Sequence, residues 1–109
     1  MSAANGKLTA FISGPITGVE NFKRVFDEAA AALEAAGYEP VNPTNFPPMM
    51  DWGDAMIACL SAMRCADILV DLPGWDGSKG SHIEHLFAEG TGKLTVSLAE
   101  ALAAARQAE

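Results

Sequence analysis

Cysteines, basic residues and long apolar runs are all scarce in this chain of 109 residues. Its two cysteines, Cys59 and Cys65, form no Cys-x-x-Cys motif, so we interpret them as buried thiols in a reducing compartment rather than as a disulfide. No apolar run approaches the roughly 20 residues that cross a bilayer, and the short polar segment before Leu8 is unlike a signal peptide. These absences predict a soluble, cytoplasmic protein that contacts no membrane.

Positive charge is also scarce. Seven lysines and arginines stand against fourteen acidic residues, and the formal net charge is −7. General nucleic-acid binding depends on neutralising many phosphates, so this balance argues against it. A small phosphorylated ligand remains compatible with the composition, because a few backbone amides can hold one phosphate.

The apolar residues follow an alternating pattern of strands and helices. Strands are expected over 8–13, 38–41, 66–72 and 94–97, and helices over 21–36, 52–64, 81–89 and from Ser97 onward, where Ser97-x-x-Glu100 fits a capping box. Helical crossovers between successive strands require a mainly parallel sheet. We therefore predict one domain over 1–109, an α/β doubly wound sheet of four or five strands with helices on both faces (Rossmann-like or flavodoxin-like).

The segment from Gly77 to Glu84 carries the clearest functional signal. It follows the apolar run Ile68–Leu72, so a strand runs into a loop rich in glycine and serine and then into a helix. Open α/β sheets bind ligands at this edge, and helix N-termini attract anions there. Glu84 has two interpretations: a nucleophile or general base, or the acidic member of a Ser81-x-x-Glu84 capping box.

Three further groups of residues have both a functional and a structural interpretation. Gly14-Pro15-Ile16-Thr17-Gly18 follows the first strand and is either a binding loop or a tight turn. Asp67 and Asp71 are four apart in one strand, so their side chains share a face. His82 and His85 are three apart rather than four and lack an evident third ligand, so no metal is expected.

An apolar group surrounds the start of the second helix. It consists of Met49, Met50, Trp52 and Met56. We interpret these side chains as core or as an oligomer contact, because an exposed apolar patch is unfavourable in water. The prediction is a homodimer or a higher homo-oligomer.

Several short motifs together resemble a known family over nearly the whole chain. They are Phe11–Gly18, Cys65–Val70 and Gly80-x-x-x-Glu84. In order and spacing they resemble the nucleoside 2-deoxyribosyltransferase superfamily, which includes the 2'-deoxynucleoside 5'-phosphate N-hydrolases. Asp51-Trp52 and Leu72-Pro73-Gly74-Trp75 are similar to a small bacterial and phage branch of that superfamily.

The resemblance implies roles for individual residues. Glu84 would attack the anomeric carbon of the sugar and form a glycosyl-enzyme ester, and Asp67 would orient the nucleoside or assist proton transfer. Ser78, six positions before Glu84, matches the serine of the nucleotide hydrolases, where the transferases carry aspartate. Thr17 stands where the hydrolases carry an arginine, and Lys79 is the available substitute for that cation. The serine that a neighbouring subunit supplies in the hydrolases has no match here.

The prediction is an N-glycosidase that cleaves the base–sugar bond of a (deoxy)nucleoside 5'-monophosphate without a cofactor. Alternatives are base exchange between deoxyribonucleosides, a nucleotide-binding module without turnover, and cleavage of a dinucleotide such as NAD. The expected catalytic residues are Glu84 and Asp67. The expected substrate-binding residues are Ser13, Gly14, Pro15, Ile16, Thr17, Gly18, Ser78, Lys79, Gly80 and Ser81.

Overall fold

A computed structural model describes residues 6–47 and 51–108 of the chain. Strands and helices alternate along it, as the apolar pattern predicts. The elements are β1 (Thr9–Ser13), α1 (Phe22–Ala35), β2 (Glu39–Val41), the short 3-10 helix η1 (Pro43–Asn45), α2 (Trp52–Met63), β3 (Ile68–Asp71), the 3-10 helix η2 (Trp75–Gly77), α3 (Lys79–Gly90), β4 (Leu94–Ser97) and α4 (Leu98–Gln107).

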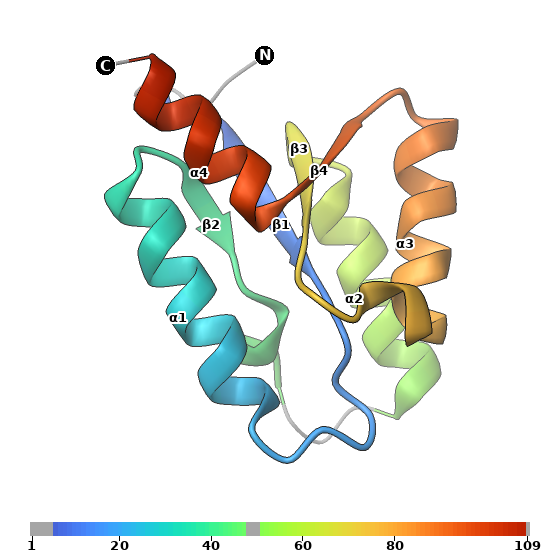
Figure 1. The fold of residues 1–109 in the computed structure, drawn as a ribbon. Helices are drawn as coiled ribbons and strands as arrows, with labels where there is room; N and C mark the ends of the chain where they lie inside the picture. The colour runs from blue at the N-terminus through green and yellow to red at the C-terminus, as the bar shows by residue number, and fades with distance from the viewer. Residues whose placement is uncertain (1–5, 48–50, 109) are drawn as a thin grey trace.

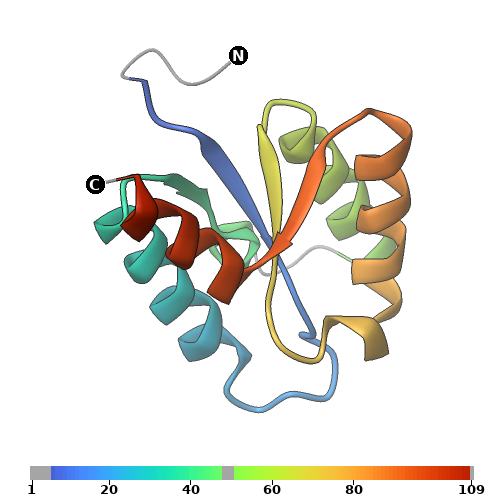
Figure 2. The same ribbon diagram turned by 45° about the horizontal axis from the view of Figure 1, so that its top comes forward.

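The strands form a parallel sheet in the order β2-β1-β3-β4. Helices α1 and α4 cover one face of it, and α2 and α3 cover the other (Figures 1 and 2). The first half of the chain therefore adds β2 on one side of β1, and the second half adds β3 and β4 on the other side. The prediction of a doubly wound parallel α/β sheet is confirmed, with four strands in the described part of the chain.

Alternating residues of the central strands build a separate core on each face. Ala10 and Ile12 pack with Phe26 and Leu33 of α1, while Phe11 and Leu69 pack with the α2–α3 layer. Strands that are buried on both faces are apolar at almost every position, which explains their continuous apolar runs.

The strand register places polar residues together at the carboxyl edge of the sheet. Ser13 at the end of β1 is paired with Asp71 at the end of β3, and Asp71 with Ser97 of β4. Ser13 lies two residues after Phe11, and Asp71 two after Leu69, so both side chains point to the face that α2 and α3 cover. Buried polar side chains are thus concentrated at one edge, under α3.

Helix α3 begins two residues earlier than predicted. The expected start at Ser81 is wrong, because Ser78 is the N-cap and its Oγ accepts a hydrogen bond from the Ser81 amide (3.3 Å). The predicted capping box of α4 is confirmed: Ser97 Oγ accepts from the Glu100 amide, and the Glu100 carboxylate accepts from the Ser97 amide.

The cysteines differ from the sequence interpretation. Both are free thiols, and Cys59 is half-buried as expected of a helix that packs on the sheet. Cys65 is exposed, because it lies in the turn after α2, where its amide donates to Ala62 and its side chain faces solvent. The prediction of a buried thiol is wrong for Cys65. Among the helices of residues 6–47 and 51–108, none is both long and apolar enough to cross a membrane.

Candidate active site

Glu84 is a buried carboxylate in the second turn of α3, only 6% exposed. Because the helix begins at Lys79, Glu84 is too far from the N-terminus to cap it. Its Oε1 instead accepts a hydrogen bond from Ser13 Oγ at 2.6 Å, across the gap between β1 and α3. The capping-box interpretation of Glu84 is therefore wrong, and a contact distant in sequence holds the carboxylate.

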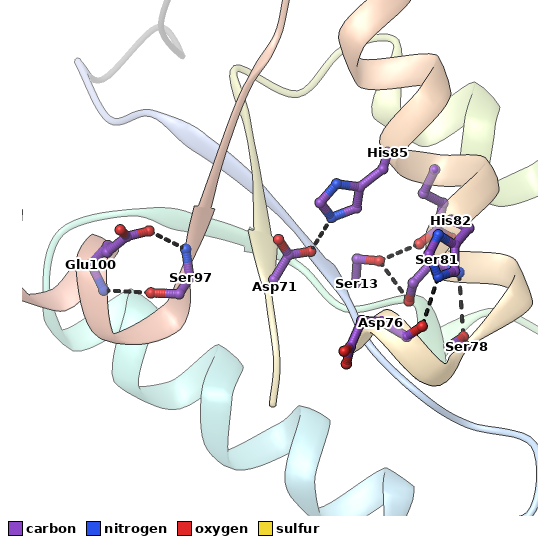
Figure 3. Close-up of polar contacts among 10 residues, drawn as sticks. Ser13, Asp71, Asp76, Ser78, Ser81, His82, His85, Ser97 and Glu100 are labelled. Atoms are coloured by element: carbon purple, nitrogen blue, oxygen red, sulfur yellow. Dashed lines mark hydrogen bonds and ion pairs between the residues drawn. The ribbon is translucent and has the colours of Figure 1, made fainter. Parts of the chain in front are cut away.

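Two serine hydroxyls form a short chain that ends at Glu84. The Ser13 and Ser81 Oγ atoms lie 3.0 Å apart, and both side chains are buried (Figure 3). A hydroxyl group has one hydrogen to donate and can rotate to suit its partners. When Glu84 is ionised, Ser13 donates to the carboxylate and Ser81 donates to Ser13. The chain therefore stabilises the charged form.

Burial dominates the electrostatics of Glu84. It raises the pKa of the carboxyl from 4.5 to about 7, against the hydrogen bonds from Ser13 and Cys59, which lower it. Of the nearby charged groups, His85 lowers this pKa and Asp71 raises it. A carboxyl group with a pKa near neutrality can exist in either protonation state at cellular pH, which suits a group that takes part in chemistry.

A cavity of about 530 Å³ lies against Glu84. Most of its wall comes from the loop after β1, the inner side of α2 and the first turns of α3. The lining residues are Ile12, Gly14, Pro15, Ile16, Thr17, Phe26, Pro43, Trp52, Ala55, Met56, Cys59, Gly77, Ser78, Lys79, Gly80, Ser81 and Glu84. Its volume is within the range of small-molecule sites.

The N-terminus of α3 gives one side of this cavity a positive character. The helix dipole adds partial positive charge there. The Lys79 ammonium lies 4.6 Å from the centroid of the Trp52 ring, a cation–π contact that restrains it beside the cavity. Gly80 allows α2 to approach closely, because a Cβ at this position would lie 3.3 Å from Met56 Sδ.

A second polar group lies on the β4 side of α3. His85 Nε2 and Asp71 Oδ1 are 2.6 Å apart (Figure 3). The Trp75 ring stacks on the His85 ring, with centroids 3.8 Å apart. His82 Nε2 contacts the Asp76 carbonyl at 2.7 Å. These contacts fasten the β3–α3 loop to the helix. In the described part of the chain, no three His, Cys, Asp or Glu side chains are grouped to hold a metal ion.

Most of the predicted site residues come together in space. Residues 14–17 and 78–81 line the same cavity as Glu84. Ser13 is not among the lining residues, but it donates a hydrogen bond to the Glu84 carboxylate. Gly18, with a φ of +80°, lies in the turn beyond and is not among the lining residues.

Asp67 is not brought to this site. It precedes β3, so it lies at the opposite edge of the sheet, about 13 Å along the strand from Asp71 at about 3.3 Å per residue. There its Oδ2 accepts a hydrogen bond from the Thr9 amide at 2.7 Å. The contact fastens the start of β1 to β3, so the structure gives Asp67 a place in the sheet and not beside Glu84.

Helix α2 supplies residues that sequence reasoning did not assign to the site. Trp52, Met56 and Cys59 line the cavity, whereas the sequence pattern predicts core or an oligomer contact for Trp52 and Met56. Their spacing of four and three residues places them on one helix face, a signal present in the sequence. Met49 and Met50 lie outside the described residues.

Comparison with known proteins places the chain in a family. A family model described as a domain of unknown function (DUF4406) matches residues 8–97. The chain belongs to the DUF4406 family. No curated protein matches it.

One similar solved structure is the CMP N-glycosidase BcmB of Clostridium botulinum, with a TM-score of 0.59 and 23% sequence identity. The match covers 82% of this chain and 66% of that one, so this chain spans just under two thirds of the neighbour's length. The shared fold is nucleoside 2-deoxyribosyltransferase-like, and the resemblance seen in the sequence motifs is confirmed at the level of the fold.

Proposed function

We propose that this protein is an N-glycosidase that cleaves the base–sugar bond of a (deoxy)nucleoside 5'-monophosphate. The observation that carries the proposal is Glu84, a buried carboxylate held by Ser13 at the wall of a cavity that the N-terminus of α3 also lines. A carboxylate suits a reaction with an oxocarbenium-like transition state, because it stabilises positive charge on the sugar and then serves as a leaving group.

The reaction proceeds in two displacements. The ionised Glu84 carboxylate attacks the anomeric carbon, the C–N bond breaks, and the base departs with the bonding electron pair and takes a proton from solvent. Water then attacks the glycosyl-enzyme ester and loses a proton to solvent, which releases the sugar phosphate and returns Glu84 to its carboxylate. Two displacements at one carbon retain its configuration.

The phosphate group fits at the N-terminus of α3. Ser78 and Lys79 lie there, and the helix dipole favours an anion at that end. Lys79 offers a point charge to the phosphate rather than the two-pronged contact of an arginine. The global charge of −7 opposes a phosphate, so local contacts at this helix end must outweigh it.

The comparisons support a nucleotide as substrate, since the similar structure is named a CMP N-glycosidase. Base exchange between nucleosides is the second candidate, and the resemblance of Ser78 to the hydrolase serine favours hydrolysis over it. A binding module without turnover would leave Glu84 only the role of a helix cap, and that role is taken by Ser78.

The test is chromatography of the products after incubation with a panel of ribo- and deoxyribonucleosides and their 5'-monophosphates. Wild-type protein is compared with Glu84→Gln, and with Glu89→Gln as a matched control that changes an exposed glutamate of the same helix. Free base is expected from wild type and Glu89→Gln but not from Glu84→Gln. A new nucleoside formed with excess acceptor base would indicate base exchange, and no product from any substrate would contradict the proposal.

A further inference from the structure

Helices α2 and α3 both begin beside the cavity. They pack against each other and run in the same direction, so their first turns face one another at the carboxyl edge of the sheet (Figure 1). Trp52 is the first residue of α2, and Lys79 is the first residue of α3. Both line the cavity, and the Lys79 ammonium lies 4.6 Å from the centroid of the Trp52 ring. A cation–π contact therefore joins the two helix ends.

Lys79 brings positive charge to this cavity without a neutralising partner. Among residues 6–47 and 51–108, no other lysine or arginine lines the cavity, and the Lys79 ammonium forms no ion pair. A carboxylate in contact with the ammonium would neutralise it and compete with a bound anion. An indole ring attracts a cation through its quadrupole and leaves the charge intact. The charge of Lys79 is thus held in place and is still available to a ligand.

The indole also compensates for the flexibility of lysine. A lysine ammonium is a point charge on a four-carbon stem, and fixing it on a ligand costs side-chain entropy. The Lys79 side chain is exposed, but its contact with the Trp52 ring restricts it before any ligand arrives. A group that is ordered in advance binds its ligand more tightly, because less entropy is lost on binding.

We propose that Trp52 is a specificity-determining residue that positions Lys79: its indole holds the ammonium beside the cavity, where it binds the phosphate group of a phosphate monoester. Discrimination between a nucleoside monophosphate and its nucleoside then depends on Trp52, although the indole acts through Lys79. The effect on substrate choice rests on the proposed function, whereas the effect on binding of a sugar phosphate does not.

The first experiment tests the contact by NMR of the lysine ε-methylene protons, with Lys79→Met assigning the signal. The ring current of an indole moves protons above its face to lower chemical shift. The Lys79 signal is expected at such a lowered value in wild type and near the value of an ordinary exposed lysine in Trp52→Leu. Trp52→Phe, which keeps a smaller aromatic face, is expected to give an intermediate value.

The second experiment measures the binding of ribose 5-phosphate by titration calorimetry, which requires no turnover. Loss of the charge in Lys79→Met predicts a Kd at least about tenfold higher, and loss of the contact in Trp52→Leu predicts one about two- to fivefold higher. In the double variant, Trp52→Leu adds nothing to the effect of Lys79→Met. The matched control is Lys23→Met, which removes an exposed lysine of α1 and changes the net charge equally, and it leaves Kd unchanged.

The third experiment compares kcat/KM for a monophosphate and for its nucleoside. If Trp52 acts through Lys79, Trp52→Leu lowers kcat/KM for the monophosphate by raising KM, and leaves the value for the nucleoside unchanged. Direct contact of the indole with the base or the sugar would lower both values equally and would contradict the proposal.

A Lys79 signal that is the same in wild type and Trp52→Leu would overturn the proposal, and so would equal Kd values for ribose 5-phosphate in these two proteins. A further loss of binding from Trp52→Leu in the Lys79→Met background would also contradict it, because the indole would then act on the ligand directly. If wild type binds ribose 5-phosphate with the expected dependence on Trp52 but cleaves no nucleotide, the proposed function fails and the role of Trp52 in phosphate binding stands.

Discussion

Burial of the Glu84 carboxyl group makes the stability of the fold depend on pH. Its pKa is about 7 in the folded chain against 4.5 ordinarily, so the folded form holds more protons between these values. The free energy of unfolding must then fall as pH rises through that window. Glu84→Gln carries no charge there, and we expect it to be more stable than wild type above pH 7, by up to about 3 kcal/mol.

Urea unfolding at about pH 5 and about pH 8 measures this difference. Burial also raises the pKa of Asp71, but that group is present in both proteins and cancels in the comparison. If the stability difference between wild type and Glu84→Gln is equal at the two pH values, the pKa of Glu84 is not raised in the folded protein.

The same pKa sets the pH dependence of catalysis. The nucleophile must be ionised, so kcat is expected to rise as pH passes through about 7 and then to level off. The measurement is kcat at saturating substrate, because the second ionisation of a phosphate, near pH 6, also affects binding. A flat profile across this range would argue against Glu84 as the nucleophile.

At the level of the elements, local sequence patterns predict the alternation of strands and helices but not the contacts between them. The apolar runs and their glycine and proline boundaries are sufficient for the fold. Ser78 and Ser81 are both good N-caps by sequence, and only the contact of Ser81 with Ser13 on a distant strand decides between them. Glu84 is selected correctly as a residue of this edge, while its partner Ser13 is hidden by sequence distance.

The two aspartates of β3 show a second limit of sequence reasoning. Spacing predicts that Asp67 and Asp71 share a face of the sheet. Strand β3 nevertheless places them at opposite edges of the sheet, because Asp67 precedes the strand and Asp71 ends it. The rule that ligands bind at the carboxyl ends of parallel strands would have selected Asp71. The motif resemblance instead selected Asp67, which the structure places at the other edge.

The first turn of α3 allows capping and phosphate binding to be separated experimentally. Ser78→Asp keeps a side chain that can cap the helix, so the free energy of unfolding is expected to stay within about 0.5 kcal/mol of wild type. The added charge repels a phosphate, so kcat/KM for monophosphates is expected to fall by about tenfold or more, while that for nucleosides does not fall. Steady-state kinetics on paired nucleoside and monophosphate substrates measures this.

The control for this prediction is the corresponding cap of α4. Ser97→Ala and Ser78→Ala each remove one N-cap, and each is expected to lower stability by about 1 kcal/mol. Only the Ser78 variant should alter the use of monophosphates. Equal losses of monophosphate cleavage in Ser78→Asp and Ser97→Ala would show that the effect comes from stability and not from the site.

At the level of the whole molecule, the doubly wound topology determines both the site and the surface around it. Strand β2 is added on one side of β1 and strands β3 and β4 on the other, and the cavity lies at the carboxyl edge beside β1. Helices α2 and α3, which form two of its walls, also face outward. Their outer surface carries Ile57 and Leu86, which are 65% and 68% exposed.

Exposed side chains of this size on two neighbouring helices lead us to expect a homo-oligomer that covers the α2–α3 face. A stable interface buries at least about 1,000 Å², which is enough to include both residues. Gel filtration with light scattering is expected to give a dimer or larger at micromolar concentration. Ile57→Glu and Leu86→Glu should each shift the measured mass toward that of a monomer, because a charge would then be buried at the interface.

The control is Ala31→Glu, at an exposed position of α1 on the other side of the sheet, which should leave the mass unchanged. A monomeric wild type would contradict the expectation, and an oligomer insensitive to both α2–α3 variants would place its interface elsewhere.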